Sequence, residues 1–246
     1  MTARMKDLYF LCMAFDERIS TVKEEVTNAF QWDSLGVSMP SETTVECSGC
    51  GEPQPFLVWE SLNVPLDSVE KEELLNGGLT VFKCQKCGWS GDVVYPLLYH
   101  DMERRVMIWL LPDDEEPDNA LIPVEQLTED YQLRRVETKE QLIEKIRIFD
   151  FSFDDRVMEF LKLTLYEQWA EKKEPLEGEL FFAGLEKDEA GGDRISFEHA
   201  QGEEMETISV PVDSYKKLVE WLAAKFPRVA AGTWLRVDQT FAQALR

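Results

Sequence analysis

Two matched pairs of cysteines are the residues in this chain best suited to chemistry. The pairs are Cys47 with Cys50 and Cys84 with Cys87. Each C-x2-C pair is followed at once by a glycine, Gly51 or Gly88, which can take a positive φ where the chain leaves the turn. Such a turn lets two thiolates reach one metal ion, and two turns supply the four sulfurs of a tetrahedral structural zinc site. We therefore predict a structural Zn²⁺ cofactor bound by all four cysteines.

Two other interpretations of the cysteines remain open, namely two pairs of reduced thiols and a redox-active pair. A thioredoxin-like motif needs a single pair in a βαβ context, and this chain has two matched turns. A metal with four thiolate ligands has no open coordination position and activates no water. The cysteines thus predict a structural element, and we assign no catalytic residue.

Outside the cysteines, the candidates for chemistry are few. His100 beside Asp101 could act as a base with its orienting carboxylate, although we expect these residues at the polar tip of a hairpin. We expect the second histidine, His199, at an exposed position of a strand. Asp154 and Asp155 could hold a metal, but their position favours a helix cap. An enzyme that uses His100 and Asp101 is therefore only an alternative.

The charge of the chain restricts its partners. The net charge is −22, from 48 acidic and 26 basic residues among 246. Nucleic-acid phosphates and anionic membranes attract clustered Lys and Arg, so both are unfavourable partners. We expect another protein, with a basic surface as one option. Two nucleic-acid-linked alternatives remain, an acidic mimic of DNA and a ribbon binder with a local basic patch. That patch would consist of Lys83, Lys86, Arg104 and Arg105.

The remaining cysteine and the apolar runs bear on the compartment. Cys12 leaves an odd cysteine count, which together with zinc-like spacing favours a reducing environment. The longest apolar run, residues 8–15, is far shorter than the roughly 18 residues that span a bilayer. We therefore expect a cytoplasmic protein.

The apolar patterns predict an α+β protein in five segments. They are a helical N-terminal extension (1–38), a four-cysteine zinc-ribbon-like β module with an inserted helix (39–112), an acidic linker (113–130), a helical hairpin (131–174) and an α+β C-terminal region (175–246). In the ribbon, Asp67 should cap a helix that stops at residues 76–78, and strands at 93–98 and 106–111 should flank a turn at 99–105.

After the linker the apolar period changes to that of helices. Thr138 and Asp154 should cap two helices that pair antiparallel. A hairpin of strands 179–185 and 194–200, a third strand at 207–210 and a helix opening at Asp213 should follow. The chain should end with a strand at 234–237 and a short helix at 241–245.

Several of these segments together resemble the CpXC family of bacterial and archaeal proteins. The segments are residues 47–51, 74–77, 82–88, 99–101, 142–146 and 154–156, and the resemblance spans most of residues 39–170. Ser48 and Gln85 stand where the family name places proline. The resemblance implies a zinc-bearing domain of a bacterial protein and no particular reaction. We therefore expect a zinc-stabilised protein-interaction or regulatory module.

Overall fold

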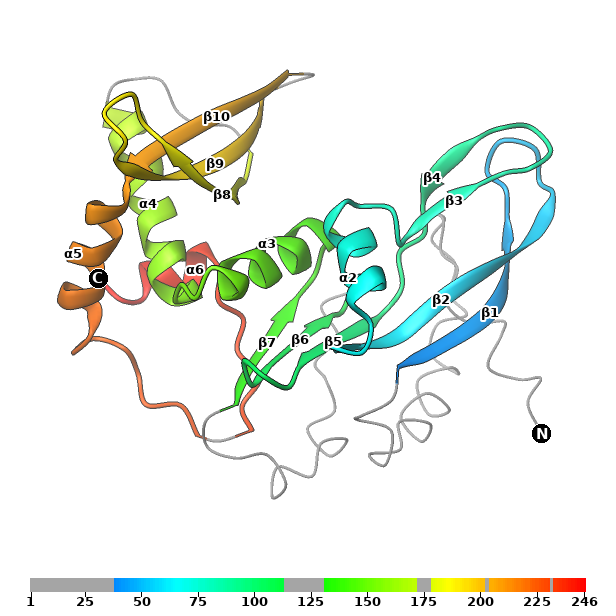
Figure 1. Cartoon of the computed structure of the whole chain (residues 1–246), viewed down its shortest axis with the longest axis horizontal. Coiled ribbons are helices and arrows are strands. Elements are labelled where there is room, and N and C mark those ends of the chain that lie inside the picture. Colours follow the sequence, from blue (N-terminus) through cyan, green and yellow to red (C-terminus); the bar gives the residue numbers. More distant parts are fainter. Residues whose placement is uncertain (1–37, 113–130, 172–177, 202–203, 231) are drawn as a thin grey trace. The chain divides into compact units, whose positions relative to one another are not determined.

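The computed structural model describes residues 38–112, 131–171, 178–201, 204–230 and 232–246. The predicted N-terminal helices and the acidic linker lie outside these residues. The elements are mixed helices and strands, which confirms the α+β fold class (Figure 1). The contacts divide the chain into two compact units. The first covers Met1–Lys139 and Ala231–Trp234, and the second covers Glu140–Ala230 and Leu235–Arg246.

A five-stranded mixed sheet forms the centre of the first unit. Its strands are β1 (Met39–Glu46), β2 (Pro53–Val64), β5 (Leu97–Asp101), β6 (Val106–Leu110) and β7 (Gln132–Val136), in the order β1-β2-β5-β6-β7. The pairs β2–β5 and β6–β7 are parallel, and the other two are antiparallel. Strand β7 corrects the prediction of a helical hairpin from residue 131. Its Leu133 packs with Leu98, Met107 and Trp234, which holds the segment in the sheet.

The predicted zinc ribbon lies at one end of this sheet. Strands β3 (Val81–Lys83) and β4 (Ser90–Asp92) form a second antiparallel hairpin, and helix α2 (Ser68–Leu75) lies between β2 and β3 in the sequence. The helix is at the predicted place and stops before Gly77, which has a φ of 75°. Asp67 precedes it but makes no side-chain cap bond. Its Oδ2 instead accepts the backbone N–H of Asn63 at 2.7 Å, so Asp67 fastens the end of β2.

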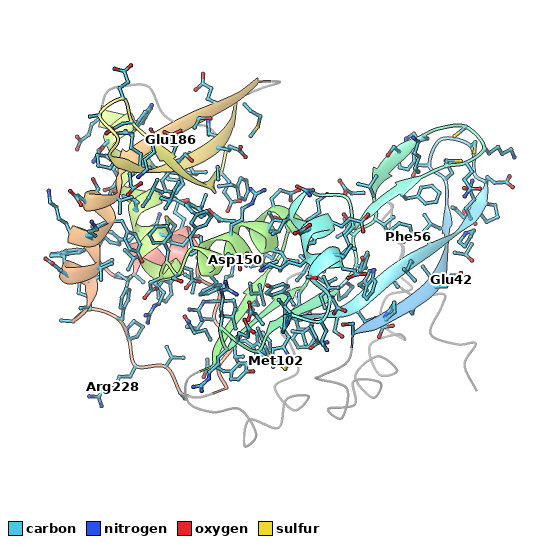
Figure 2. All side chains as sticks on the ribbon, viewed as in Figure 1. Glu42, Phe56, Met102, Asp150, Glu186 and Arg228 are labelled. Carbon is cyan, nitrogen blue, oxygen red and sulfur yellow. The ribbon has the colours of Figure 1, made fainter. Side chains whose placement is uncertain are left out.

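The turn between β5 and β6 is shorter than predicted. Tyr99, His100 and Asp101 belong to β5, where every residue is buried, and only residues 102–105 make the turn. Arg105 has a φ of 55°, which lets so short a turn close. Met102, labelled in Figure 2, lies in this turn. The expectation of an exposed hairpin tip at His100 is therefore wrong.

The second unit packs helices against a three-stranded antiparallel sheet. The strands are β8 (Leu180–Lys187), β9 (Asp193–Gln201) and β10 (Glu204–Pro211), in the order β10-β9-β8. The helices are α3 (Lys139–Asp150), α4 (Asp155–Glu171), α5 (Val212–Leu222) and α6 (Gln239–Gln243). The predicted hairpin, third strand and C-terminal helix are thus present. Leu235 makes only an isolated bridge, so the described chain has no strand at 234–237.

One face of this sheet closes the core of the second unit. Phe182 of β8 and Ile195 and Phe197 of β9 are fully buried in one cluster with side chains of α4, such as Met158. His199 is also buried, with 1% of its surface exposed, and its predicted exposure is wrong. Successive side chains of a strand alternate between faces, so His199 shares the buried face with residues 195 and 197.

Helices α3 and α4 cross at a steep angle and do not form the predicted antiparallel pair (Figure 1). A buried network of ion pairs connects them. Lys145 Nζ lies 2.9 Å from Glu159 Oε1 and 3.6 Å from Asp155 Oδ2. Lys162 Nζ lies 3.0 Å from Glu144 Oε2 and 3.2 Å from Glu159 Oε1. Because charges this deeply buried are tolerated only when paired, the network favours the observed crossing of the helices.

The network also extends to the sheet. Glu144 Oε1 accepts the backbone N–H of Phe182 in β8 at 2.7 Å, so α3 is tied to the first strand of the second unit. Burial by itself would lower the pKa of Lys162, but the carboxylates of Glu144 and Glu159 outweigh burial and raise it above its ordinary value. Both lysines of the network behave in this way, so they stay charged at neutral pH.

We predict that Lys162→Met strongly destabilises the second unit. The change leaves Glu144 and Glu159 without one buried partner, and breaking a buried pair costs about 3–5 kcal/mol of unfolding free energy. The measurement is urea denaturation followed by helical circular dichroism. Lys216→Met is the matched control, because Lys216 pairs with Asp213 on the surface and its loss should leave the midpoint nearly unchanged. Equal midpoints for the two variants would contradict a structural role of the network.

Candidate metal centre

The two cysteine turns have the same backbone construction. In the first, Gly51 N donates to Cys47 O at 2.7 Å, and in the second, Gly88 N donates to Cys84 O at 3.0 Å. Gly51 and Gly88 have φ values of 69° and 76°, as their position after each turn predicts. A Cβ on either glycine would meet no atom within 4 Å, so the left-handed backbone and not lack of space favours glycine there.

The fold brings the four sulfurs together. Cys47 Sγ lies 3.6 Å from Cys87 Sγ, and Cys50 Sγ lies 3.7 Å from Cys84 Sγ. All four atoms lie within 4.8 Å of one another, and the four cysteines are free thiols. A tetrahedron with metal–sulfur bonds of about 2.3 Å has sulfur–sulfur edges of about 3.8 Å. Two of the sulfur–sulfur distances are thus close to this edge length, and the cluster is compatible with a metal site.

Aromatic side chains support the two turns. Trp89, Phe82 and Phe56 form a chain of ring contacts, with centroids 6.3 Å and 6.2 Å apart, and Figure 2 labels Phe56 on its strand. The Trp89 side chain lies directly against Gly49 and Gly91. A Cβ on Gly49 would approach Trp89 Cβ to 2.9 Å, and one on Gly91 would overlap the indole ring. These glycines are therefore needed for close packing, a role that the motif alone did not predict.

Gln54 connects the two turns at the sulfurs, and sequence reasoning missed it. Its Nε2 donates to Cys84 Sγ at 3.1 Å, and its Oε1 accepts the backbone N–H of Gln85 at 2.9 Å. A proline at position 85 would have no such N–H to donate. The available signal was Gln54 itself, a residue with both donor and acceptor seven positions after Cys47 in the strand that leaves the first turn. Lys86 and Glu52 add an ion pair between the turns.

The two cysteine turns also shift the pKa values of their thiols. The backbone N–H of Cys87 points at Cys84 Sγ and is the main cause that lowers the pKa of Cys84 to about 6, assisted by the N–H of Lys86. For Cys87, the N–H of Trp89 acts to lower the pKa, but burial and the three neighbouring sulfurs outweigh it and raise the pKa to about 12. Without a cation the cluster cannot carry four thiolates, whereas a bound metal ion would stabilise all four.

The structure does not assemble the alternative base of His100 and Asp101. His100 Nδ1 lies 3.1 Å from Asn63 Oδ1 and its Nε2 lies 2.9 Å from Tyr131 Oη. This pattern fits a neutral ring that donates to Asn63 and accepts from Tyr131. Asp101 receives both the backbone N–H and the guanidinium of Arg104. Neighbours in a strand point to opposite faces, so Asp101 does not orient His100.

The other two candidates have structural partners. Asp154 Oδ1 accepts the backbone N–H of Arg156 at 2.9 Å, as a helix cap does, and Asp155 is fully buried beside Lys145. The four cysteines are the only group of three or more metal-ligand side chains within the described residues. The predicted basic patch of Lys83, Lys86, Arg104 and Arg105 is partly neutralised by ion pairs. Lys86 pairs with Glu52, and Arg104 pairs with Asp101.

The sulfur cluster lies inside the segment that comparison with known proteins identifies. A family model described as CpXC protein matches residues 45–162. Over this segment the chain is similar to the CpXC family. No curated protein and no solved structure is significantly similar to the chain. The CpXC segment includes all four cysteines, the buried His100, helix α3 and the part of α4 up to Lys162. In the described part of the chain, no helix combines the length and apolar character needed to span a bilayer.

We predict that Gln54→Ala weakens metal binding without abolishing it. The change removes the side-chain donor to Cys84 Sγ and frees the N–H of Gln85, and loss of such outer contacts lowers metal affinity roughly 10-fold or more. The measurement is Zn²⁺ titration in competition with a chromogenic chelator. Gln243→Ala, an exposed position on α6, is the control and should keep the parent affinity. Equal affinity in Gln54→Ala would show that the bridge does not act on the sulfurs.

Proposed function

We propose that this protein is a zinc-stabilised protein-interaction or regulatory module and that it catalyses no reaction at the metal. The observation that carries the proposal is the spacing of the four sulfurs, which matches the shell of a structural zinc ion. Zinc accepts four thiolates in a tetrahedron and prefers sulfur more than magnesium or calcium does. With every position taken by a protein sulfur, the metal has no site for substrate or activated water.

A protein partner is supported by the surface of the first unit. Leu66 in the turn before α2 and Val69 in the first turn of the helix are 65% and 70% exposed. Large apolar side chains this exposed and this close together are typical of contact sites. The net charge of −22 would favour association with a basic partner and disfavour nucleic acid. The ion pairs of Lys86 with Glu52 and of Arg104 with Asp101 agree with that choice.

The zinc component predicts one metal ion per chain with sulfur-only coordination. Elemental analysis of protein purified under reducing, chelator-free conditions would measure the metal, and X-ray absorption would measure its ligands. Cys84→Ser should lose zinc and unfold the ribbon, because an unfolded chain has no preformed site. Cys12→Ser removes the cysteine outside the cluster and should keep both zinc and fold. Nitrogen in the coordination shell, or a Cys84→Ser protein that melts like the parent, would refute the structural zinc.

The interaction component predicts a partner that depends on Leu66 and Val69. Cross-linking of the tagged full chain in cells, followed by mass spectrometry, should recover a protein that the double variant Leu66→Asp, Val69→Asp loses. Met205→Asp changes an equally exposed side chain on β10 and should retain the partner. Duplex DNA should not be shifted at about 150 mM salt. A DNA shift at low micromolar protein would contradict the proposal and favour a nucleic-acid-linked function.

A further inference from the structure

The second unit contains a pocket of about 280 Å³ above the buried ion pairs. Its walls come from α3, α4, the start of β8 and the segment that leads into α6. The lining includes Glu159, Lys162, Tyr166, Glu179, Arg236 and Asp238. A volume of this size corresponds to roughly nine molecules of liquid water, enough for a small organic molecule. The pocket is separate from the sulfur cluster, and nothing in the proposed function uses it.

Lys162 at the base of the pocket has no donor left for a ligand. Its ammonium bonds to Glu144 Oε1 at 3.1 Å, to Glu144 Oε2 at 3.0 Å and to Glu159 Oε1 at 3.2 Å. An ammonium has three N–H donors, and these three acceptors use them all. Lys162 therefore holds the two glutamates in place and offers no site for an anion.

Glu159, in contrast, has acceptor positions that no described donor uses. Both lysine bonds, from Lys145 at 2.9 Å and from Lys162, end on its Oε1. Among the residues that the structure describes, none donates a hydrogen bond to Glu159 Oε2. The side chain is 5% exposed and lines the pocket. A carboxylate has about four acceptor positions on its two oxygens, so a buried Glu159 retains unused acceptor capacity beside an open volume.

The charges around the pocket also leave an excess of carboxylate. The network below it contains three acids, Glu144, Asp155 and Glu159, against the two lysines. At the rim, Arg236 Nε donates to Asp238 Oδ2 at 2.7 Å, and Asp238 Oδ1 caps α6 through the N–H of Phe241, so both oxygens of Asp238 are engaged.

Glu179 adds a further carboxylate at the rim. It is exposed, and its contact with Gln141 Nε2 is long at 3.5 Å. The pocket thus presents two carboxylates with unused acceptor positions, one at its base and one at its rim, and no cation with a donor to spare at its base.

We propose that this pocket binds a small organic cation, with an ammonium or guanidinium group donating to Glu159 Oε2 and to Glu179. Leu163 and the ring of Tyr166, which also line the pocket, would contact the aliphatic part of such a molecule. A guanidinium fits a carboxylate with two parallel hydrogen bonds, which gives orientation as well as affinity. A metal ion is a poorer occupant, because these carboxylates do not converge as a group of three ligands in the described structure.

The test is calorimetric titration of the zinc-loaded full chain with agmatine, which carries a guanidinium and an ammonium on a four-carbon stem. Glutarate, a dianion of similar length, is the matched ligand. We expect saturable binding of agmatine and none of glutarate. Glu179→Gln should weaken agmatine roughly tenfold, the loss expected for one charge-assisted hydrogen bond. Glu159→Gln should do the same if circular dichroism shows it folded. If Glu159→Gln is not folded, Glu179→Gln decides the question by itself, because the Glu179 side chain is exposed and is not part of the core.

Glu186→Gln serves as the control for general charge effects. Glu186 is exposed on β8, is labelled in Figure 2 and does not line the pocket. Its agmatine affinity should equal that of the parent. No saturable binding of agmatine up to millimolar concentration would overturn the proposal. So would glutarate binding as tight as agmatine binding, or equal losses in Glu179→Gln and Glu186→Gln, which would indicate surface ion pairing. Zinc content is unaffected by each of these outcomes, so failure here is distinct from failure of the proposed function.

Discussion

The two cysteine turns of the first unit hold together four sulfur atoms that cannot all ionise without a cation. The β1–β2 and β3–β4 hairpins each end in one cysteine turn, and apart from the sulfurs only a few side chains connect the two ends. These include the Trp89 side chain against Gly49, the ring contact of Phe56 with Phe82, the Gln54 bridge, and the ion pair of Lys86 with Glu52. A metal ion that binds all four thiolates would turn two short hairpins into one rigid end, which so few apolar contacts cannot do.

The second unit buries five charged side chains between two helices and a sheet. Replacing such groups by apolar residues can be neutral or stabilising in other proteins, so their presence is weak evidence for stability. Here each lysine contacts two carboxylates, and Glu144 also accepts a backbone N–H of β8. We infer that the network selects one crossing of α3 and α4 and one register against β8. It also places Glu159 at the base of a pocket.

The two sites therefore have opposite chemical characters. The sulfur site would be closed with a metal bound, because four thiolate ligands complete a tetrahedral shell and leave no position for another molecule. The pocket beside Glu159 can still accept a ligand. All three N–H donors of Lys162 are used, whereas Glu159 Oε2 accepts no hydrogen bond from the described residues.

The sequence by itself determined the cluster of four cysteines and the α+β fold class. The spacing of C-x2-C-G is a local pattern, and a turn of four residues places its two sulfurs whatever the rest of the chain does. The helix stop at 76–78, the hairpin of strands 179–185 and 194–200, and the apolar period of α4 are local patterns of the same kind and could be predicted from the sequence. Tertiary structure alone decided the burial of His100 and His199, because a strand's exposed or buried face depends on what packs against it. It also decided the crossing of α3 and α4, since Glu144, Lys145, Glu159 and Lys162 look like an ordinary charged helix surface until a second helix covers them.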